Sequence, residues 1–311
     1  MSGIKIKGTG RSLPERILTN GELAQTVDTS DEWIVSRTGI RERRICTKES
    51  HTGLCAAAAQ NALEHAGILP EQIGVCIVAT MTPDTLVPSA ACTMQKALGL
   101  SCDTVCFDLN AACTGFLYAL HTAECLLAAA PKKFGLVIGA DLFSRVLDWS
   151  DRSTCILFGD GAGAAVIEWR AEWPSAGAVL GCAGNSELLR CPLQNGYLTM
   201  EGQRVFKFAL EAVPWCIDRV LERQGLTAGD VDFFVFHQAN ARIIDLAAKK
   251  YQIPPEKYCK NIERFGNTSA ASIPIVLSEL EETGRLSSGN RVLLVGFGGG
   301  LTWGGALVEI A

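Results

Sequence analysis

Short runs of apolar residues alternate along the chain with longer segments in which apolar residues recur at helical spacing. The runs have the length of buried strands. We expect a helix over 51–66, which ends at Gly67, and shorter helices capped by Asn20, running to residue 27, and by Ser30. The strand-like runs are 4–7, 75–79, 104–109, 136–140, 233–236 and 292–295. This alternation predicts the α/β class.

The pattern repeats after about half the chain. Residues 62–68 (Ala-Leu-Glu-His-Ala-Gly-Ile) align with 220–226 (Val-Leu-Glu-Arg-Gln-Gly-Leu) on a shift of 158 residues (220 − 62), and an apolar run follows both. Two weaker pairs of similar segments are 159–168 with 296–309, and 89–91 with 269–271. These matches predict two related halves, 1–170 and 171–311, packed as one body.

Composition and charge exclude several classes of protein. Of the 311 residues, 48% are hydrophobic and 20% are charged, which is typical of a globular chain with a large core. The net charge of −5 does not favour nucleic-acid binding. The charge-free stretch 109–123 is too short for a membrane span. Because residues 4–7 read as a strand rather than a signal peptide, we expect a cytoplasmic protein.

The 13 cysteines are unusual for a chain of this length. Their spacing is irregular, with no C-x-x-C pair and no zinc-finger spacing, so neither a disulfide framework nor a metal site is expected. Most are expected to be reduced and buried as small apolar side chains. The open question is whether one of them has a different role.

Cys113 differs from the others by its position. It follows the apolar run 104–109 and begins a helical pattern within Asn-Ala-Ala-Cys-Thr-Gly at 110–115. A thiol at a helix N-terminus lies at the positive end of the helix dipole, which favours the thiolate. Small neighbours would let a substrate approach the sulfur. One more buried cysteine is the alternative.

His237 and Asn267 also follow predicted strands. His237 comes directly after the run 233–236, at the carboxyl end of a strand, where open α/β sheets place their sites. Asn267 lies in a turn of small residues. Capping roles would explain each residue alone, whereas together with Cys113 they suggest a thiol nucleophile with two neutral hydrogen-bond donors.

The glycine-rich segments 159–163 and 296–300 do not fit a phosphate-binding loop. The first lacks a following Lys-Ser/Thr, and the second leads into a strand rather than a helix. Close backbone packing, or backbone N–H groups directed at an oxyanion, explains them better.

Six segments together resemble β-ketoacyl-acyl-carrier-protein synthase III, the initiating condensing enzyme of bacterial fatty-acid synthesis. They are Asp-Thr-Ser-Asp-Glu-Trp-Ile at 28–34, Arg-Thr-Gly-Ile-Arg-Glu-Arg at 37–43, Ala-Cys-Thr-Gly-Phe at 112–116, Phe-Gly-Asp-Gly-Ala-Gly-Ala-Ala at 158–165, His-Gln-Ala-Asn at 237–240 and Gly-Asn-Thr-Ser-Ala-Ala-Ser at 266–272. The resemblance implies a thiolase-like fold, with two related halves in a five-layered αβαβα arrangement, and a homodimer.

The resemblance also implies catalytic roles. Cys113 would take an acyl group from acyl-CoA, and His237 and Asn267 would bind the thioester carbonyl of malonyl-acyl carrier protein during its decarboxylation. The resulting carbanion would attack the acyl-Cys113 thioester. Backbone N–H groups of Cys113 and Gly299 would hold the oxyanion. No cofactor is implied, since the CoA thioester is a substrate.

Substrate contacts follow from the same motifs. Trp33 and Arg152 would sandwich the adenine of CoA, and Arg37 would meet a CoA phosphate. Gly202 and Asn240 would line the pantetheine tunnel.

Two further expectations concern the carrier protein and the primer. Lys207, Arg242 and Lys249 would form a basic patch for an acidic carrier protein, although an ordinary solvated helix face explains the lysines equally well. Val87 stands where several short-chain enzymes have a bulky Phe that reaches the partner's acyl pocket. The smaller side chain would admit longer or branched primers.

Three other functions compete with this interpretation. One is a related acyl-CoA condensing enzyme or acyltransferase of secondary metabolism. Another is a Cys-His thioester hydrolase, with His237 as the base for Cys113. The third is a non-catalytic acyl- or CoA-binding protein, which would not need all three chemical residues.

Overall fold

The strands form two groups that face each other across a central layer of helices. The computed structural model describes residues 3–194 and 196–311. The first group has the order β5(Val105–Leu109), β4(Ile73–Ala79), β6(Phe134–Asp141), β7(Gly161–Arg170), β1(Gly3–Ser12). The second has the order β11(Phe233–Phe236), β12(Arg291–Gly298), β13(Gly300–Ile310), β8(Val179–Asn185). A short parallel pairing of β1 with β13 joins the groups into one nine-stranded sheet.

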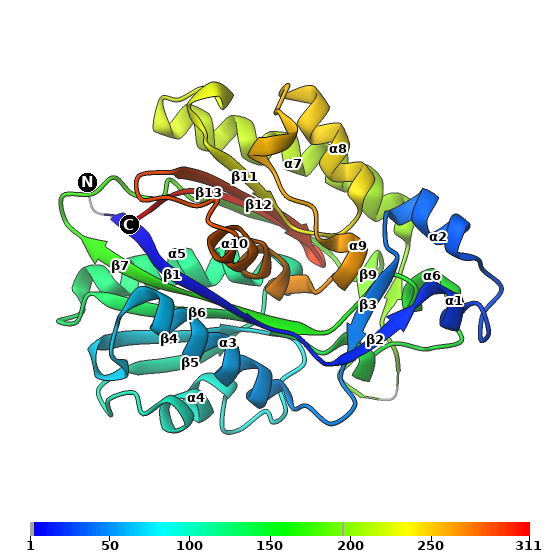
Figure 1. Cartoon of the computed structure of the whole chain (residues 1–311), viewed down its shortest axis with the longest axis horizontal. Coiled ribbons are helices and arrows are strands. Elements are labelled where there is room, and N and C mark those ends of the chain that lie inside the picture. The colour runs from blue at the N-terminus through cyan, green and yellow to red at the C-terminus, as the bar shows by residue number, and fades with distance from the viewer. Residues whose placement is uncertain (1–2, 195) are drawn as a thin grey trace.

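Helices cover both groups of strands and fill the space between them (Figure 1). The central helices are α5(Gly115–Ala129) and α10(Ser272–Glu282), the first group is covered by α3(His51–Ala66) and α4(Ala90–Leu98), and the second by α7(Gly202–Gln224) and α8(Ala241–Lys250). Three clusters of buried apolar residues lie between the layers and pack them together. The five-layered thiolase-like arrangement expected from the resemblance is therefore confirmed.

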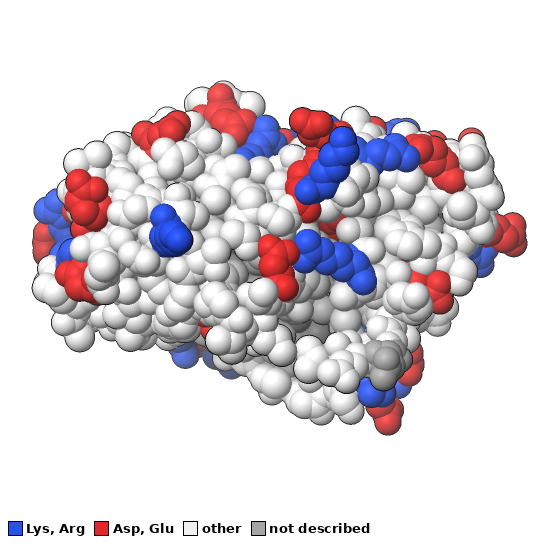
Figure 2. All heavy atoms as spheres, turned by 90° about the horizontal axis from the view of Figure 1, so that it is seen from below, with Lys and Arg blue, Asp and Glu red and all other residues white. Residues whose placement is uncertain are grey.

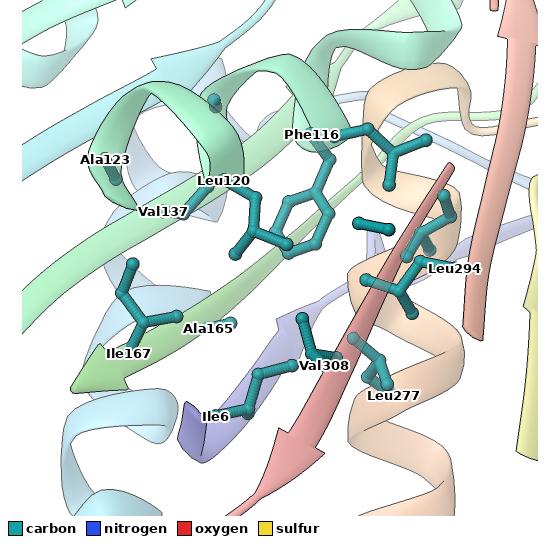
Figure 3. Packing of buried hydrophobic residues seen from close by; sticks show 14 of the residues in the cluster. Ile6, Phe116, Leu120, Ala123, Val137, Ala165, Ile167, Leu277, Leu294 and Val308 are labelled. Atoms are coloured by element: carbon teal, nitrogen blue, oxygen red, sulfur yellow. The ribbon is translucent and has the colours of Figure 1, made fainter. Parts of the chain in front are cut away.

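The central cluster receives side chains from both groups of strands. Figure 3 shows Phe116 of α5 and Leu277 of α10 directed toward strand residues, including Ile6 of β1 and Leu294 of β12. The helical segment Ala112–Ala129, which contains α5, is long and apolar enough by length and composition to cross a membrane, but here it belongs to the middle layer of the core.

The two groups of strands repeat one topology. The order of the strands in the second group matches that in the first. The position of the edge strand β5 is occupied in the second group by the segment at Tyr258, which pairs with Phe234 of β11 through an isolated bridge. Helices α3 and α7 end alike, at Gly67 (φ 64°) and Gly225 (φ 65°), positive φ values that glycine adopts without strain. The similarity of 89–91 to 269–271 was misleading, because α4 and α10 do not occupy equivalent places. The boundary near residue 170 stays a prediction.

Two other expectations need correction. Helix α1(Asn20–Leu23) is capped by Thr19, which with Glu22 forms a capping box, and it ends well before residue 27. Of the 13 cysteines, all free, only five are buried and four are exposed. Several therefore lie on polar or amphipathic faces, where a small thiol is tolerated without packing.

Short elements form the end of the molecule remote from the termini (Figure 1). They are β2(Arg16–Thr19), α2(Asp31–Thr38), β3(Glu42–Ile45), α6(Arg152–Cys155), β9(Leu189–Arg190), β10(Thr199–Met200) and α9(Ile262–Phe265). Ser30 caps α2 as expected, accepting from the Trp33 N–H.

Candidate active site

Cys113 lies in a single 3-10 turn, Ala112–Thr114, between β5 and α5. The preceding residue, Ala112, has φ 48°, an uncommon conformation for a residue with a side chain. Gly298 of β12 lies so close that a Cβ there would be 2.8 Å from the Cys113 nitrogen. A sharp turn and a glycine thus fix the sulfur, which is only 5% exposed, at the end of the central helix.

Burial dominates the electrostatics of the thiol. It raises the pKa of Cys113 to about 12, although Ser269 and the backbone N–H groups of Cys113 and Gly299 oppose the rise. The helix-dipole argument from the sequence predicted a favoured thiolate. Desolvation outweighs that effect here, because Cys113 is enclosed between α5, β12 and the 3-10 turn Ser269–Ala271.

His237 directly follows β11, and its backbone N–H donates to the Val295 carbonyl at 2.8 Å. Its Nδ1 is 2.7 Å from the Ser272 hydroxyl, and the ring meets Phe297 edge-on at 5.6 Å between centroids. Burial lowers the pKa of His237 to about 3. When Ser272 donates to Nδ1, the hydrogen is on Nε2, and the ring is a neutral donor.

Asn267 is held by its backbone. Its N–H donates to the Leu157 carbonyl at 2.8 Å, and its carbonyl accepts from the Gly159 N–H at 3.0 Å. The side-chain Oδ1 accepts from the Ser269 N–H at 2.8 Å, which orients the amide NH₂ group. Asn267 therefore also presents a neutral donor.

The three chemical residues predicted from the sequence meet in one place. Cys113, His237 and Asn267 all line a cavity of about 680 Å³. Among the described residues, no cluster of three or more His, Cys, Asp or Glu side chains has the arrangement of a metal site.

The same cavity is lined by the residues expected to contact CoA. Trp33 and Arg37 come from α2, and Arg152 comes from α6. The Arg152 guanidinium lies 4.9 Å from the centre of the Trp33 ring. An adenine ring stacked between the indole and the guanidinium needs a separation of about 7 Å between them, because each of its two faces takes a contact of ~3.5 Å. The expected sandwich therefore requires Arg152 to swing away from the indole.

Gly202 and Asn240 also line this cavity. Asn240 has a structural role as well, because its Oδ1 caps α8 at the Arg242 N–H and its Nδ2 donates to the Arg37 carbonyl. Lys207 and Lys249 lie on the exposed surfaces of α7 and α8, outside the cavity lining, whereas Arg242 reaches the lining.

A second cavity of about 320 Å³ adjoins Cys113 on the side of Gly299. The sequence analysis did not predict this cavity, because the residues that line it come from loops and strand ends far apart in the chain. Its apolar lining includes Met81, Phe143, Phe158, Leu189 and Leu198.

Val87 is not part of this second cavity. It is 87% exposed, on the loop that precedes α4. Its expected contact with a partner's pocket stays a prediction.

Sequence reasoning also missed Ser269 and Ser272. Ser269 Oγ donates to Cys113 Sγ at 3.5 Å, and Ser272 bonds His237. Both stand in the motif at 266–272, but only Asn267 had been singled out there.

Comparisons with known proteins agree with this geometry. Residues 107–184 match the family described as 3-Oxoacyl-[acyl-carrier-protein (ACP)] synthase III, and 221–310 match its C-terminal part. The chain is 44% identical to beta-ketoacyl-[acyl-carrier-protein] synthase III of Clostridium acetobutylicum, over 99% of both chains.

The chain belongs to the β-ketoacyl-[acyl-carrier-protein] synthase III family.

Solved structures of the family superpose closely. The crystal structure of 3-oxoacyl-[acyl-carrier-protein] synthase III from Aquifex aeolicus has a TM-score of 0.93 and 45% identity, covering 99% of this chain and 100% of that chain. The priming β-ketosynthase of the R1128 polyketide pathway also has a TM-score of 0.93, at 36% identity, covering 99% and 96%.

Proposed function

We propose that the protein is an acyltransferase, a β-ketoacyl-[acyl-carrier-protein] synthase III that initiates fatty-acid synthesis. It condenses an acyl-CoA primer with malonyl-acyl carrier protein through an acyl-Cys113 intermediate. The observation that carries the proposal is that Cys113 adjoins two cavities, while two neutral donors, His237 and Asn267, share the larger one with it. Family membership supports the same reaction.

In the first half-reaction the Cys113 sulfur attacks the thioester carbonyl of acyl-CoA. The backbone N–H groups of Cys113 and Gly299, which oppose the rise of the Cys113 pKa, are suited to an oxyanion formed there. CoA then leaves through the larger cavity, between α2 and α6. The acyl chain occupies the smaller, apolar cavity.

In the second half-reaction malonyl-acyl carrier protein enters through the larger cavity. Loss of CO₂ leaves an enolate, whose oxygen His237 and Asn267 would stabilise. Neutral donors suit this step, because a carboxylate in their place would repel the malonyl group. The enolate carbon attacks the acyl-Cys113 carbonyl, which gives the β-ketoacyl product. The side chains and backbone supply every group, so the reaction needs no cofactor.

Both half-reactions use one sulfur, so ping-pong kinetics are expected. A hydrolase would instead need His237 as a base toward Cys113. With a pKa of about 3 and Nδ1 engaged by Ser272, this imidazole is a weak base at neutral pH.

A role in secondary metabolism is the second candidate. The observation that favours it is the close superposition with a priming ketosynthase of a polyketide pathway. Identity to that protein is 36%, against 44% to the Clostridium acetobutylicum enzyme and 45% to the Aquifex aeolicus enzyme. The fatty-acid role therefore has the stronger support.

The proposal includes a homodimer in the cytoplasm. Strand β5 is an edge strand with exposed Val105, and the nearby Leu86 and Val87 are exposed apolar side chains. Figure 2 shows a broad area with few charged side chains on the face seen from below. A monomer by light scattering would contradict the dimer. Thirteen cysteines without a disulfide fit a reducing compartment.

The deciding experiment is acylation with acetyl-, isobutyryl- and octanoyl-CoA, followed by peptide mass spectrometry. We expect the acyl mass on Cys113, and no acylation or condensation by Cys113→Ala. With malonyl carrier protein the label should pass to a β-ketoacyl product. Labelling at another residue, or release of free acid without the carrier, would overturn the proposal. Strict preference for acetyl-CoA would contradict only the expectation for Val87.

A further inference from the structure

One arginine is fully buried and its hydrogen-bond partners are neutral. Arg43, on β3, is 0% exposed, and although burial lowers the pKa of its guanidinium to about 10, the group stays a cation at neutral pH. Its Nη1 donates to the Leu18 carbonyl and to Asn20 Oδ1, at 3.2 and 2.8 Å, and its Nη2 donates to the Ile156 carbonyl at 2.6 Å. Burying a charge among neutral oxygens is costly, which indicates that these contacts serve a purpose.

The Arg43 guanidinium connects three segments of the chain. Its partners lie on β2, at the start of α1 and in the loop that follows α6. Asn20 is itself buried, and its Nδ2 donates to Asp31 Oδ1 of α2 at 2.8 Å and to the Ile40 carbonyl at 2.7 Å. Because a guanidinium is a rigid fork of donors, it fixes its acceptors relative to one another. Arg43 therefore joins the segments around α2 to the loop 156–159.

The loop 156–159 in turn holds Asn267. Phe158 pairs with Asn267 through an isolated parallel bridge. The residues on either side of Phe158 form its hydrogen bonds, since the Leu157 carbonyl accepts from the Asn267 N–H and the Gly159 N–H donates to the Asn267 carbonyl. Ile156, Leu157 and Phe158 line the larger cavity together with Asn267. A shift of this loop would therefore move the Asn267 amide within the cavity.

The aliphatic part of Arg43 lies against both segments of this bridge. A Cβ at Gly159 would be 3.1 Å from Arg43 Cβ, and a Cβ at Gly266 would be 3.3 Å from the same atom. Gly266 directly precedes Asn267 and has φ 64°, in the region that favours glycine. The Arg43 side chain thus supports the bridge by packing and, through the Ile156 carbonyl, by a hydrogen bond.

We propose that Arg43 is a positioning residue for Asn267. It fixes the loop 156–159 through the Ile156 carbonyl, and the loop holds the Asn267 amide where it can donate to the enolate oxygen. The use of Asn267 for that enolate rests on the proposed function. Within the part of the chain that the structure describes, the hydrogen bonds of Arg43 do not involve the turn that carries Cys113. Arg43 should therefore affect decarboxylation and condensation far more than acylation of Cys113.

Two substitutions remove the fork of donors. Arg43→Lys keeps the positive charge but has one ammonium group, which cannot bond Asn20 and Ile156 in the same geometry. Arg43→Gln removes the charge and keeps a single planar donor group. Either variant that folds, as checked by circular dichroism, decides the question. The matched control is Arg44→Lys on the same strand, because Arg44 Nη1 donates to the Pro14 carbonyl at 3.2 Å rather than to the loop 156–159.

The test measures the two half-reactions of the full chain separately. Acylation of Cys113 by acetyl-CoA is followed in a single turnover by peptide mass spectrometry, and CO₂ and β-ketoacyl product are then measured after malonyl carrier protein is added to the acylated protein. We expect each Arg43 variant to slow the second half-reaction by roughly 10- to 100-fold, as misplacement by ~1 Å does, and to acylate within about threefold of the wild type. In an Asn267→Ala background the same substitution should slow the residual reaction less than about threefold, because residues that act as a unit are not additive.

A merely structural role would slow both half-reactions alike, and its effect would persist in the Asn267→Ala background. Either result overturns the positioning role, as does a wild-type rate of condensation in a folded Arg43 variant. An equal selective loss in Arg44→Lys would also overturn it. If the wild type acylates Cys113 but forms no β-ketoacyl product, the proposed function fails instead, so the two failures are distinguishable.

Discussion

Burial acts on the thiol of Cys113 and the imidazole of His237 in opposite directions, but both effects favour the uncharged group. It raises the pKa of Cys113 to about 12 and lowers that of His237 to about 3, and both shifts favour the neutral form. The resting site therefore carries little charge of its own. A malonyl carboxylate would enter without facing a fixed anion in the cavity lining.

At the scale of single residues, the His237 pKa predicts how stability depends on pH. The ordinary histidine pKa is about 6.5, so between about pH 6.5 and 3 the unfolded chain binds a proton at His237 that the folded chain does not. Stability should fall as pH falls through this window. In urea unfolding, the wild type should lose about 1.4 kcal/mol per pH unit more than His237→Asn between pH 6 and 4.

Parallel slopes for His237→Asn and the wild type would contradict a buried neutral imidazole.

At the scale of elements, glycines allow strands to lie very close to the 3-10 turns Ala112–Thr114 and Ser269–Ala271. A Cβ at Gly139 of β6 would be 2.2 Å from the Ala270 carbonyl oxygen, and one at Gly298 of β12 would meet Cys113. The glycine runs that seemed ambiguous in the sequence thus permit contacts between elements.

Gly298→Ala should therefore displace Cys113 without unfolding the protein. We expect acylation by acetyl-CoA to slow roughly 100-fold, because misplacement of about 1 Å is enough for such a loss. Gly184→Ala on β8 is the control, since a Cβ there meets nothing within 4 Å. Single-turnover kinetics and circular dichroism would check both, and a wild-type rate in Gly298→Ala would refute the argument.

At the scale of the whole molecule, charge is unevenly distributed. The net charge is −5, yet Lys207, Arg242 and Lys249 lie on α7 and α8, and Arg242 also lines the larger cavity. Within the part of the chain that the structure describes, no carboxylate forms an ion pair with them. Such unpaired cations suit an acidic carrier protein.

Charge reversal at Lys249 should weaken the carrier step alone. We expect Lys249→Glu to raise KM for malonyl carrier protein about three- to tenfold at low salt, with acylation by acyl-CoA unchanged. The difference should shrink at high salt, because exposed charges are screened. Lys48→Glu makes the same change in net charge at another exposed position, and an equal effect there would count against a local patch.

The sequence alone determined the kinds of element and most of the site. Apolar runs located β4, β6, β11 and β12, since burial on both faces requires continuous apolar residues. Gly67 and Gly225 predicted two helix ends, because the left-handed backbone conformation at a helix end depends on the local residue rather than on distant parts of the chain. Cys113, His237 and Asn267 were recognised by their positions after strands and by family motifs, and the structure places all three at one cavity.

Only the tertiary structure decided the electrostatics and the long-range contacts. Whether dipole or desolvation governs Cys113 depends on how tightly its surroundings exclude water. The contact of Ser269 with Cys113 joins residues 156 apart in sequence, which no local pattern encodes. Short stretches of sequence determine local chemistry, whereas pKa values and long-range contacts depend on segments that packing brings together.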